Sequence, residues 1–232
     1  GAIDVNQGCS GFVYSLGLAK GLIETNQANK ILVITADTYS KYINDRDKSV
    51  KTLFGDAAVC TLIMGGADDE FISNPVYGTN GKGAKNLIVP DGGARNPVSD
   101  RSYCEEKDES NNIRNRTNLF MNGREIFTFT LSTIPAVFNN ILEKENMTLD
   151  DIDIVIFHQA NKFMLDSLQR KLKIPEEKIH RSYQEFGNTV SSTIPIGLKM
   201  EMLKNNNSSR KRVALLLGFG VGLSWAGVIV KF

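Results

Sequence analysis

The sequence predicts an α/β protein built from two similar halves. Short apolar strands alternate with segments whose apolar residues recur at helical spacing, which is the pattern of α/β folds. The helix expected from Gly8 and the strand expected at Ile31 also have counterparts at Gly187 and Val213. These two units have nearly the same length, so we interpret them as a weak internal duplication.

The first half is expected to contain strands at residues 2–7, 31–34 and 57–64, with a helix at residues 10–25. In the helix, Phe12, Leu16 and Ala19 recur on one face. Both of the later strands are continuous apolar runs, which is typical of buried strands. We therefore expect Cys60, inside the third strand, to lie in the core.

The second half repeats this order after a polar stretch at residues 91–118, which we interpret as a solvated loop. Asn122 is expected to cap a helix that Pro135 kinks. Strands are expected at residues 152–157, 212–217 and 223–230, and helices at residues 163–172 and 187–203. The uncharged stretch at 213–230 reaches the lower length limit of a membrane span. Its glycines and clustered β-branched residues favour two strands joined by a turn.

Composition gives no reason to expect nucleic acid or an anionic membrane as a partner. The 232 residues include 27 basic and 26 acidic side chains, for a net charge of +1. The three cysteines, Cys9, Cys60 and Cys104, have neither a disulfide nor a metal-binding spacing. They fit a reducing cytoplasm.

Cys9 is the first candidate for chemistry. It follows a strand and begins a helix, where amide dipoles stabilise a thiolate. Gly8 and Gly11 beside it suit a tight turn that exposes the sulfur. The alternative is an inert buried cysteine at a strand end.

Two more candidates stand at the ends of predicted elements. His158 follows the strand at 152–157, at the strand end where α/β proteins place their sites, although a core histidine bonded to backbone is the alternative. Asn188 is either a functional amide or a helix cap. His180, in a polar stretch, is expected to be exposed.

Three motifs give the sequence a specific resemblance. Residues 5–12 (VNQGCSGF), 157–161 (FHQAN) and 186–189 (FGNT) resemble, in this order, the Cys, His and Asn motifs of the β-ketoacyl-acyl-carrier-protein synthase III family. The similarity covers essentially the whole chain. It implies a thiolase-like layered αβαβα fold with two halves, at residues 1–118 and 119–232. Asn188 separates this family from thiolases, which use a second cysteine, and from elongating synthases, which have histidine there.

Family members carry further residues before the nucleophile motif, so the resemblance implies a first half that is incomplete at its N-terminus. We therefore expect the polypeptide alone to be inactive.

The resemblance also implies a mechanism, the decarboxylative condensation of an acyl-CoA with malonyl-acyl-carrier protein. Cys9 would carry the acyl group, and the backbone amides of Cys9 and Val221 would form the oxyanion hole. His158 Nε2 and Asn188 Nδ2, as neutral donors, would stabilise the enolate. No metal or cofactor is expected besides these substrates.

The implied partners are a CoA thioester, an acidic acyl-carrier protein and, as a homodimer, a second copy of the enzyme in the cytoplasm. Lys162, Arg170 and Lys171 are the residues expected to contact the carrier. Phe163 stands where relatives commonly have arginine. Two alternatives remain: a cysteine-dependent acyltransferase of the same fold without decarboxylation, and a non-catalytic partner subunit.

Overall fold

The computed structural model describes residues 1–66, 71–204 and 210–232. Its helices are α1 (Gly11–Glu24), α2 (Lys48–Lys51), α3 (Gly123–Lys144), α4 (Lys162–Leu172), α5 (Tyr183–Phe186) and α6 (Thr193–Lys204). Its long strands are β1 (Lys30–Asp37), β2 (Ala57–Met64), β9 (Val213–Gly220) and β10 (Ser224–Lys231). The short strands are β3 (Val76–Thr79), β4 (Leu87–Ile88), β5 (Glu106–Lys107), β6 (Ile113–Arg114), β7 (Phe120–Met121) and β8 (Ile154–Phe157).

The main sheet has the strand order β3-β10-β9-β8, in which β8 and β9 are parallel and the other pairs are antiparallel. Every residue of β8 is buried, because its two faces contact different cores. Val155 and Phe157 belong to the core under α3 and α4, and Ile154 and Ile156 to the core that α1 shares. This burial on both faces explains why β8 is a continuous apolar run in the sequence.

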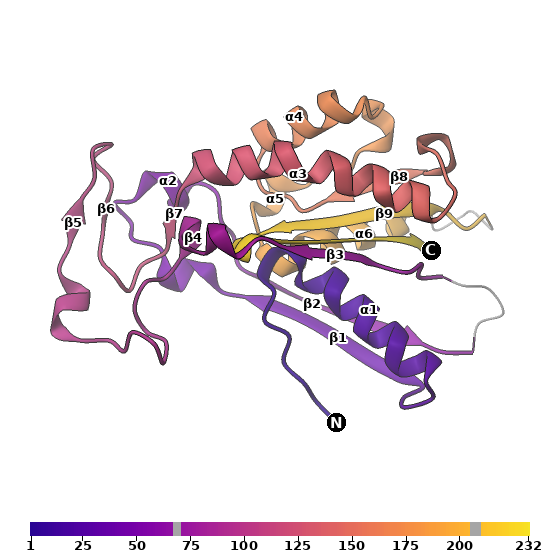
Figure 1. The fold of residues 1–232 in the computed structure, drawn as a ribbon, viewed down its shortest axis with the longest axis horizontal. Coiled ribbons are helices and arrows are strands. Elements are labelled where there is room, and N and C mark those ends of the chain that lie inside the picture. Colours follow the sequence, from indigo (N-terminus) through magenta and orange to yellow (C-terminus); the bar gives the residue numbers. More distant parts are fainter. Residues whose placement is uncertain (67–70, 205–209) are drawn as a thin grey trace.

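Helices and sheets alternate in layers. Helices α3 and α4 lie on one side of the main sheet, α1 and α6 lie on the other, and the β1-β2 pair follows beyond them (Figure 1). The side chains of Phe12, Val13 and Leu16 on α1 are fully or almost fully buried in this central layer. These layers confirm the thiolase-like arrangement predicted from the sequence.

The β1-β2 pair has one buried and one exposed face. The two strands are antiparallel, with Leu32 opposite Leu62 and Ile34 opposite Cys60. All four of these side chains are exposed. Among the described residues, no helix covers this face (Figure 1). The prediction of a core position for Cys60 is therefore wrong.

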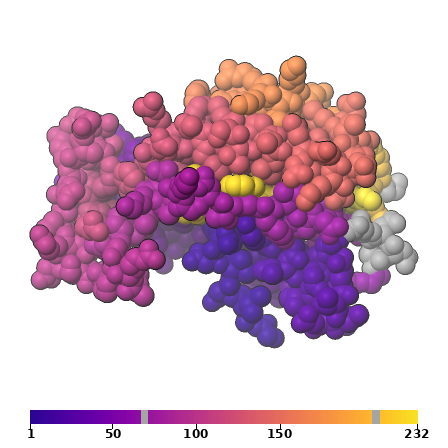
Figure 2. All heavy atoms as spheres, viewed as in Figure 1, coloured from indigo at the N-terminus to yellow at the C-terminus, as the bar shows by residue number. Residues whose placement is uncertain are grey.

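The polar stretch at 91–118 projects from one end of the molecule (Figure 2). It contains the two-residue strands β5 and β6 and one 3-10 turn, Asp100–Tyr103, and is otherwise irregular, as expected for a loop. An ion pair attaches it to the rest of the protein, since Arg114 lies 2.7 Å from the buried Asp47, and a second pair, Arg116 with Asp91 at 2.8 Å, joins its two ends. The loop is thus solvated outside and anchored at its base.

Several boundaries differ from the prediction. Residues 2–7 form no strand, and Asn188 precedes α6 by several residues and does not cap it. Asn122 does cap α3, where its side chain accepts a hydrogen bond from the amide of Glu125. Strand β3 lies in the first expected half but pairs with β10 of the second. Among the described residues, no helix is both long and apolar enough to cross a membrane.

Candidate active site

Cys9 lies in a sharp turn between the N-terminal segment and α1. The 3-10 turn Gly8–Ser10 leads directly into the helix. Gly8 has a φ of +52°, and a β-carbon there would lie 2.3 Å from Cγ1 of Val221. Glycine is therefore required by both conformation and space. The Cys9 side chain is buried at the start of the helix.

The turn that follows β9 lies against the Cys9 sulfur. A β-carbon on Gly220, the last residue of β9, would lie 2.7 Å from Sγ. Backbone hydrogen bonds from Val221 and from Cys9 itself act on the sulfur. The structure thus brings together at this atom the two amides that the sequence analysis assigned to an oxyanion hole.

Burial is the largest influence on the Cys9 thiol and raises its pKa to about 12. The hydrogen bond from Val221 opposes this effect, and the negative charge of Asp37 adds to it. The resting sulfur is a thiol, whereas the position at a helix start favoured a thiolate. A reaction at Cys9 therefore needs a proton acceptor nearby.

His158 directly follows β8, and its amide donates to the carbonyl of Leu217 at 2.9 Å. Its ring is buried edge-on against Phe219, and Nδ1 lies 2.8 Å from Oγ1 of Thr193. Burial lowers the pKa of the ring to about 3, against a smaller opposing effect of the Val190 backbone. The imidazole is therefore neutral at neutral pH.

Asn188 is held where two chain segments cross. Its amide donates to the carbonyl of Leu53 at 2.8 Å, and its carbonyl accepts from the amide of Gly55 at 3.0 Å. Its side-chain Oδ1 accepts from the amide of Val190 at 3.0 Å. The Nδ2 end of the side chain is therefore the end that can act as a donor to a ligand.

These residues line one cavity of about 50 Å³. Its polar side chains are Cys9, His158, Asn161 and Asn188. Its apolar walls are formed by Leu53, Phe54, Leu87, Met121, Ile126, Ala160, Met164 and Phe219, together with Gly123 and Gly220. The three candidates that the sequence placed at separate element ends thus share one site.

Buried hydroxyl groups support the turns around this cavity, and no sequence motif indicated them. Ser10 Oγ lies 2.8 Å from Ser224 Oγ, which links the turn of Cys9 to the turn of Val221. Ser224 Oγ is also 3.0 Å from the carbonyl of Val221. No local sequence pattern predicts a pair such as Ser10 and Ser224, because the two residues are distant in the chain.

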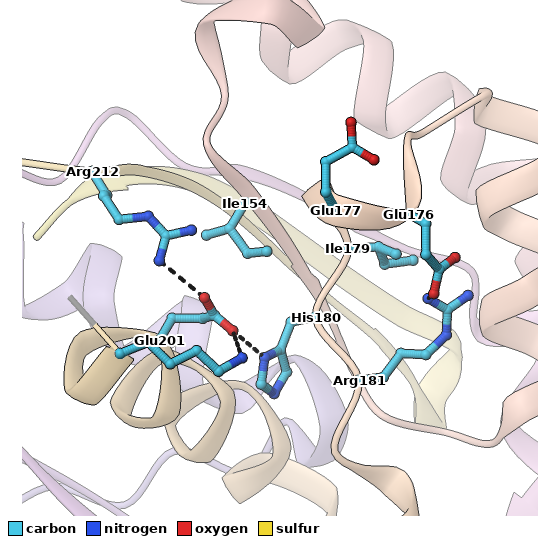
Figure 3. Close-up of a pocket in the computed structure, with 9 residues that line it drawn as sticks. Ile154, Glu176, Glu177, Ile179, His180, Arg181, Glu201 and Arg212 are labelled. Carbon is cyan, nitrogen blue, oxygen red and sulfur yellow. Dashed lines mark hydrogen bonds and ion pairs between the residues drawn. The ribbon is translucent and has the colours of Figure 1, made fainter.

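His180 lies away from the site, in the wall of a larger hollow of about 440 Å³ (Figure 3). The expectation that it is exposed is wrong, since its side chain is buried and Nδ1 lies 2.9 Å from Glu201. Hydrogen bonds from His180, Lys204 and Arg212 lower the pKa of Glu201 to about 2. The segment of His180 is buried because Ile179 pairs with β8.

The three expected carrier contacts all lie on α4 but do not form one cluster. Lys162 begins the helix and pairs with Asp166, while Arg170 and Lys171 lie about 12 Å further along it. The amine of Lys171 donates to the carbonyl of Leu131 at 2.8 Å. Their role in carrier binding stays a prediction.

Two parts of the sequence match the same protein family. Residues 3–81 match 3-oxoacyl-[acyl-carrier-protein] synthase III, and residues 142–232 match the C-terminal domain of the same enzyme. The beta-ketoacyl-[acyl-carrier-protein] synthase III of Caldanaerobacter subterraneus subsp. tengcongensis is 33% identical over 231 residues, which are 100% of this chain and 67% of the relative.

Solved structures show the same likeness. A crystal structure of a 3-oxoacyl-(acyl-carrier-protein) synthase III is 48% identical with a TM-score of 0.96, over 100% of this chain and 69% of that one. The 3-oxoacyl-(acyl-carrier protein) synthase of Burkholderia xenovorans LB400 is 38% identical with a TM-score of 0.87, over 99% and 64%. The chain thus spans about two thirds of the length of these proteins.

Proposed function

Because the chain belongs to the 3-oxoacyl-[acyl-carrier-protein] synthase III family, we propose that it carries the acyl-Cys chemistry of a decarboxylative condensation. The substrates are an acyl-CoA and a malonyl-acyl-carrier protein, and the product is a 3-ketoacyl-carrier protein that begins acyl-chain synthesis. One observation carries the proposal: Cys9, His158 and Asn188 line a single buried cavity whose wall includes the end of β9.

In the first half-reaction, Sγ of Cys9 attacks the thioester carbonyl carbon of acyl-CoA. The C–S bond to CoA breaks, and the thiol proton ends on the CoA sulfur. The backbone amides of Cys9 and Val221 donate to the oxyanion of the intermediate, and their hydrogen bonds to the resting sulfur support this role. The product is an acyl group on Cys9.

In the second half-reaction, the malonyl group loses carbon dioxide and becomes an enolate. His158 Nε2 and Asn188 Nδ2 donate to the enolate oxygen. The orientation of Asn188 supports this role, because its Oδ1 is occupied by the amide of Val190. The enolate carbon then attacks the acyl group on Cys9 and releases the sulfur.

Mass spectrometry of the natural protein after treatment with acyl-CoA tests the first step. We expect one acyl group on Cys9 and none after Cys9→Ser. An acyl group on Cys60 or Cys104, both exposed, would contradict the proposal. His158→Ala and Asn188→Ala should stop carbon dioxide release from the malonyl thioester while some acylation of Cys9 remains.

The same measurements separate the alternatives. An acyltransferase of this fold would acylate Cys9 and pass the group to an alcohol or amine without releasing carbon dioxide. A non-catalytic partner subunit would not be acylated at all. The burial of all three polar side chains in one cavity favours an enzyme, because a scaffold has no use for such a set.

We further propose that the carrier protein docks on α4, with its acidic surface near Lys162, Arg170 and Lys171. Arg170→Glu should then raise the Michaelis constant for the malonyl carrier and leave acylation by acyl-CoA unchanged. Lys144→Glu, at the end of α3, is a matched charge reversal at another helix end. Equal effects of the two variants on the Michaelis constant would reject the α4 site.

The cellular setting follows the same reasoning. The three cysteines are all free, which supports a reducing cytoplasm. A homodimer is expected, and sedimentation of the natural protein tests it.

We also expect the 232-residue polypeptide alone to show no condensing activity, since an apolar face of β1-β2 is exposed. Turnover by that purified polypeptide would contradict this expectation.

A further inference from the structure

The hydroxyl group of Thr193 is the direct hydrogen-bond partner of the His158 ring. Thr193 is the first residue of α6, and its side chain is buried. Oγ1 lies 2.8 Å from Nδ1 of His158 and donates to the carbonyl of Val190 at 3.1 Å. The hydroxyl proton of Thr193 is therefore already donated to Val190, so this hydroxyl can only accept a hydrogen bond from the ring.

This arrangement decides which ring nitrogen carries the proton. A backbone carbonyl can only accept, so the Thr193 proton points to Val190 and the oxygen lone pairs face Nδ1. The carbonyl of Val190 itself also acts on the ring as an acceptor. Two acceptors beside Nδ1 favour a proton on Nδ1, which leaves Nε2 with a lone pair in the neutral ring.

The backbone of Val190 is held in an unusual conformation that serves both partners. Its φ is +54°, a left-handed value that is rare for a β-branched residue. In this conformation its amide bonds Oδ1 of Asn188 and its carbonyl bonds Oγ1 of Thr193. The strained backbone of Val190 thus orients the side-chain amide of Asn188 directly and the imidazole of His158 through Thr193.

We propose that Thr193 is a positioning residue that keeps the proton on Nδ1 of His158 throughout the reaction, so that all proton transfer takes place at Nε2. This inference rests on the proposed condensation. It changes the sequence-based expectation in one respect: His158 donates to the enolate only after Nε2 has gained a proton, because a neutral ring with Nδ1–H carries no proton on Nε2.

In the first half-reaction, Nε2 accepts the proton of the Cys9 thiol as the sulfur attacks the acyl carbon. The leaving CoA thiolate then takes this proton from Nε2, and the ring is neutral again. The burial of Cys9, which keeps the sulfur protonated, makes such an acceptor necessary.

In the second half-reaction, the malonyl carboxylate brings a negative charge into the cavity, and Nε2 takes one proton from solvent. The C–C bond to the carboxylate breaks and releases carbon dioxide, and Nε2–H donates to the enolate oxygen. The enolate carbon attacks the acyl carbon, and the departing Cys9 thiolate takes the proton from Nε2. One solvent proton is thus consumed for each carbon dioxide released.

Nitrogen NMR of the natural protein with 15N-labelled histidine tests the proposal without substrate. Within these 232 residues there are two histidines, and His180→Gln assigns the signals by removing one set. We expect a protonated Nδ1 and an unprotonated Nε2 for His158 at neutral pH. Thr193→Ser should preserve both this tautomer and the rate of Cys9 acylation.

Thr193→Val should place a proton on Nε2 in part of the molecules. It should also slow acylation of Cys9 by about tenfold to a hundredfold, the effect that loss of an orienting partner has on metal-binding histidines, with little change in the Michaelis constant for acyl-CoA. Thr193→Ala is the second variant if valine prevents folding.

Three results would overturn the proposal: a wild-type spectrum with the proton on Nε2, a Thr193→Val protein with the wild-type tautomer, or a Thr193→Ser protein that reacts as slowly as Thr193→Val. Failure of the proposed function gives a different result, because Cys9 of the wild type would then stay unacylated whatever the tautomer.

Discussion

Acidification should destabilise the protein through His158 by an amount that the structure sets. The buried ring has a pKa of about 3 in the folded protein, whereas an exposed histidine in the unfolded chain titrates near about 6.5. Because the folded pKa is the lower one, the neutral ring contributes its full stability above about pH 6.5. That contribution is lost as the pH falls toward 3.

The magnitude follows from the two pKa values. Between them, the unfolded chain holds a proton at this site that the folded protein lacks, so each pH unit lowers the free energy of unfolding by roughly 1.4 kcal/mol. From about pH 7.5 to about pH 4.5 the loss through His158 is therefore about 3 kcal/mol.

Urea unfolding at several pH values measures this effect in the wild type and in His158→Gln, which does not titrate. Carboxylates with lowered pKa, among them Asp151 and Asp166, also lose their contribution in acid. They are common to both proteins, so they cancel in the difference. The wild type should lose about 3 kcal/mol more than the variant over this range. Parallel losses in the two proteins would refute a buried neutral His158.

Four further substitutions, in three experiments, test the surroundings of the site. Gly220→Ala should prevent acylation of Cys9 in a folded protein, because the added methyl lies 2.7 Å from Sγ; normal acylation by mass spectrometry would contradict this. Ser10→Ala and Ser224→Ala should show a coupling of about 1 kcal/mol in a double-mutant cycle of unfolding, whereas additive effects would mean that the hydroxyls do not interact. Gln159→Leu should lower the free energy of unfolding in urea by about 2 kcal/mol, since its buried side chain bonds three backbone groups; a change below about 0.5 kcal/mol would argue against this role.

Local patterns in the sequence were sufficient for the long strands and for most of the long helices. The apolar runs at β1, β2, β8, β9 and β10 predicted strands, and the helical spacing predicted α1, α3 and α4. Asn122 was a readable cap, because both the cap and the amide that donates to it lie within one turn of α3.

The errors concern residues whose surroundings are set by distant segments. His180 sits among charged neighbours in the sequence, yet its pairing with β8 and Glu201 buries it. Cys60 lies in a strand that is apolar except for Thr61, so no polar alternation marked the exposed face.

The sequence predicted residues that meet in one cavity, but it did not predict what surrounds the imidazole and the thiol there. Motif resemblance identified Cys9, His158 and Asn188, and the structure places them in one cavity. Nothing in those motifs indicated Thr193, because its contact with His158 depends on how α6 packs beside β8. The thiol state of Cys9 likewise depends on burial by the turn after β9, which no local pattern reports.

Strand β3 connects the two expected halves through backbone hydrogen bonds. It lies before residue 118 in the chain, but its hydrogen bonds run to β10, where Ala226 pairs with Tyr77. A polypeptide that begins at residue 119 would leave the edge of β10 unpaired and open to association with other chains. Pieces 1–118 and 119–232 produced together in one cell are therefore suited to complement each other, whereas each piece alone is prone to aggregate.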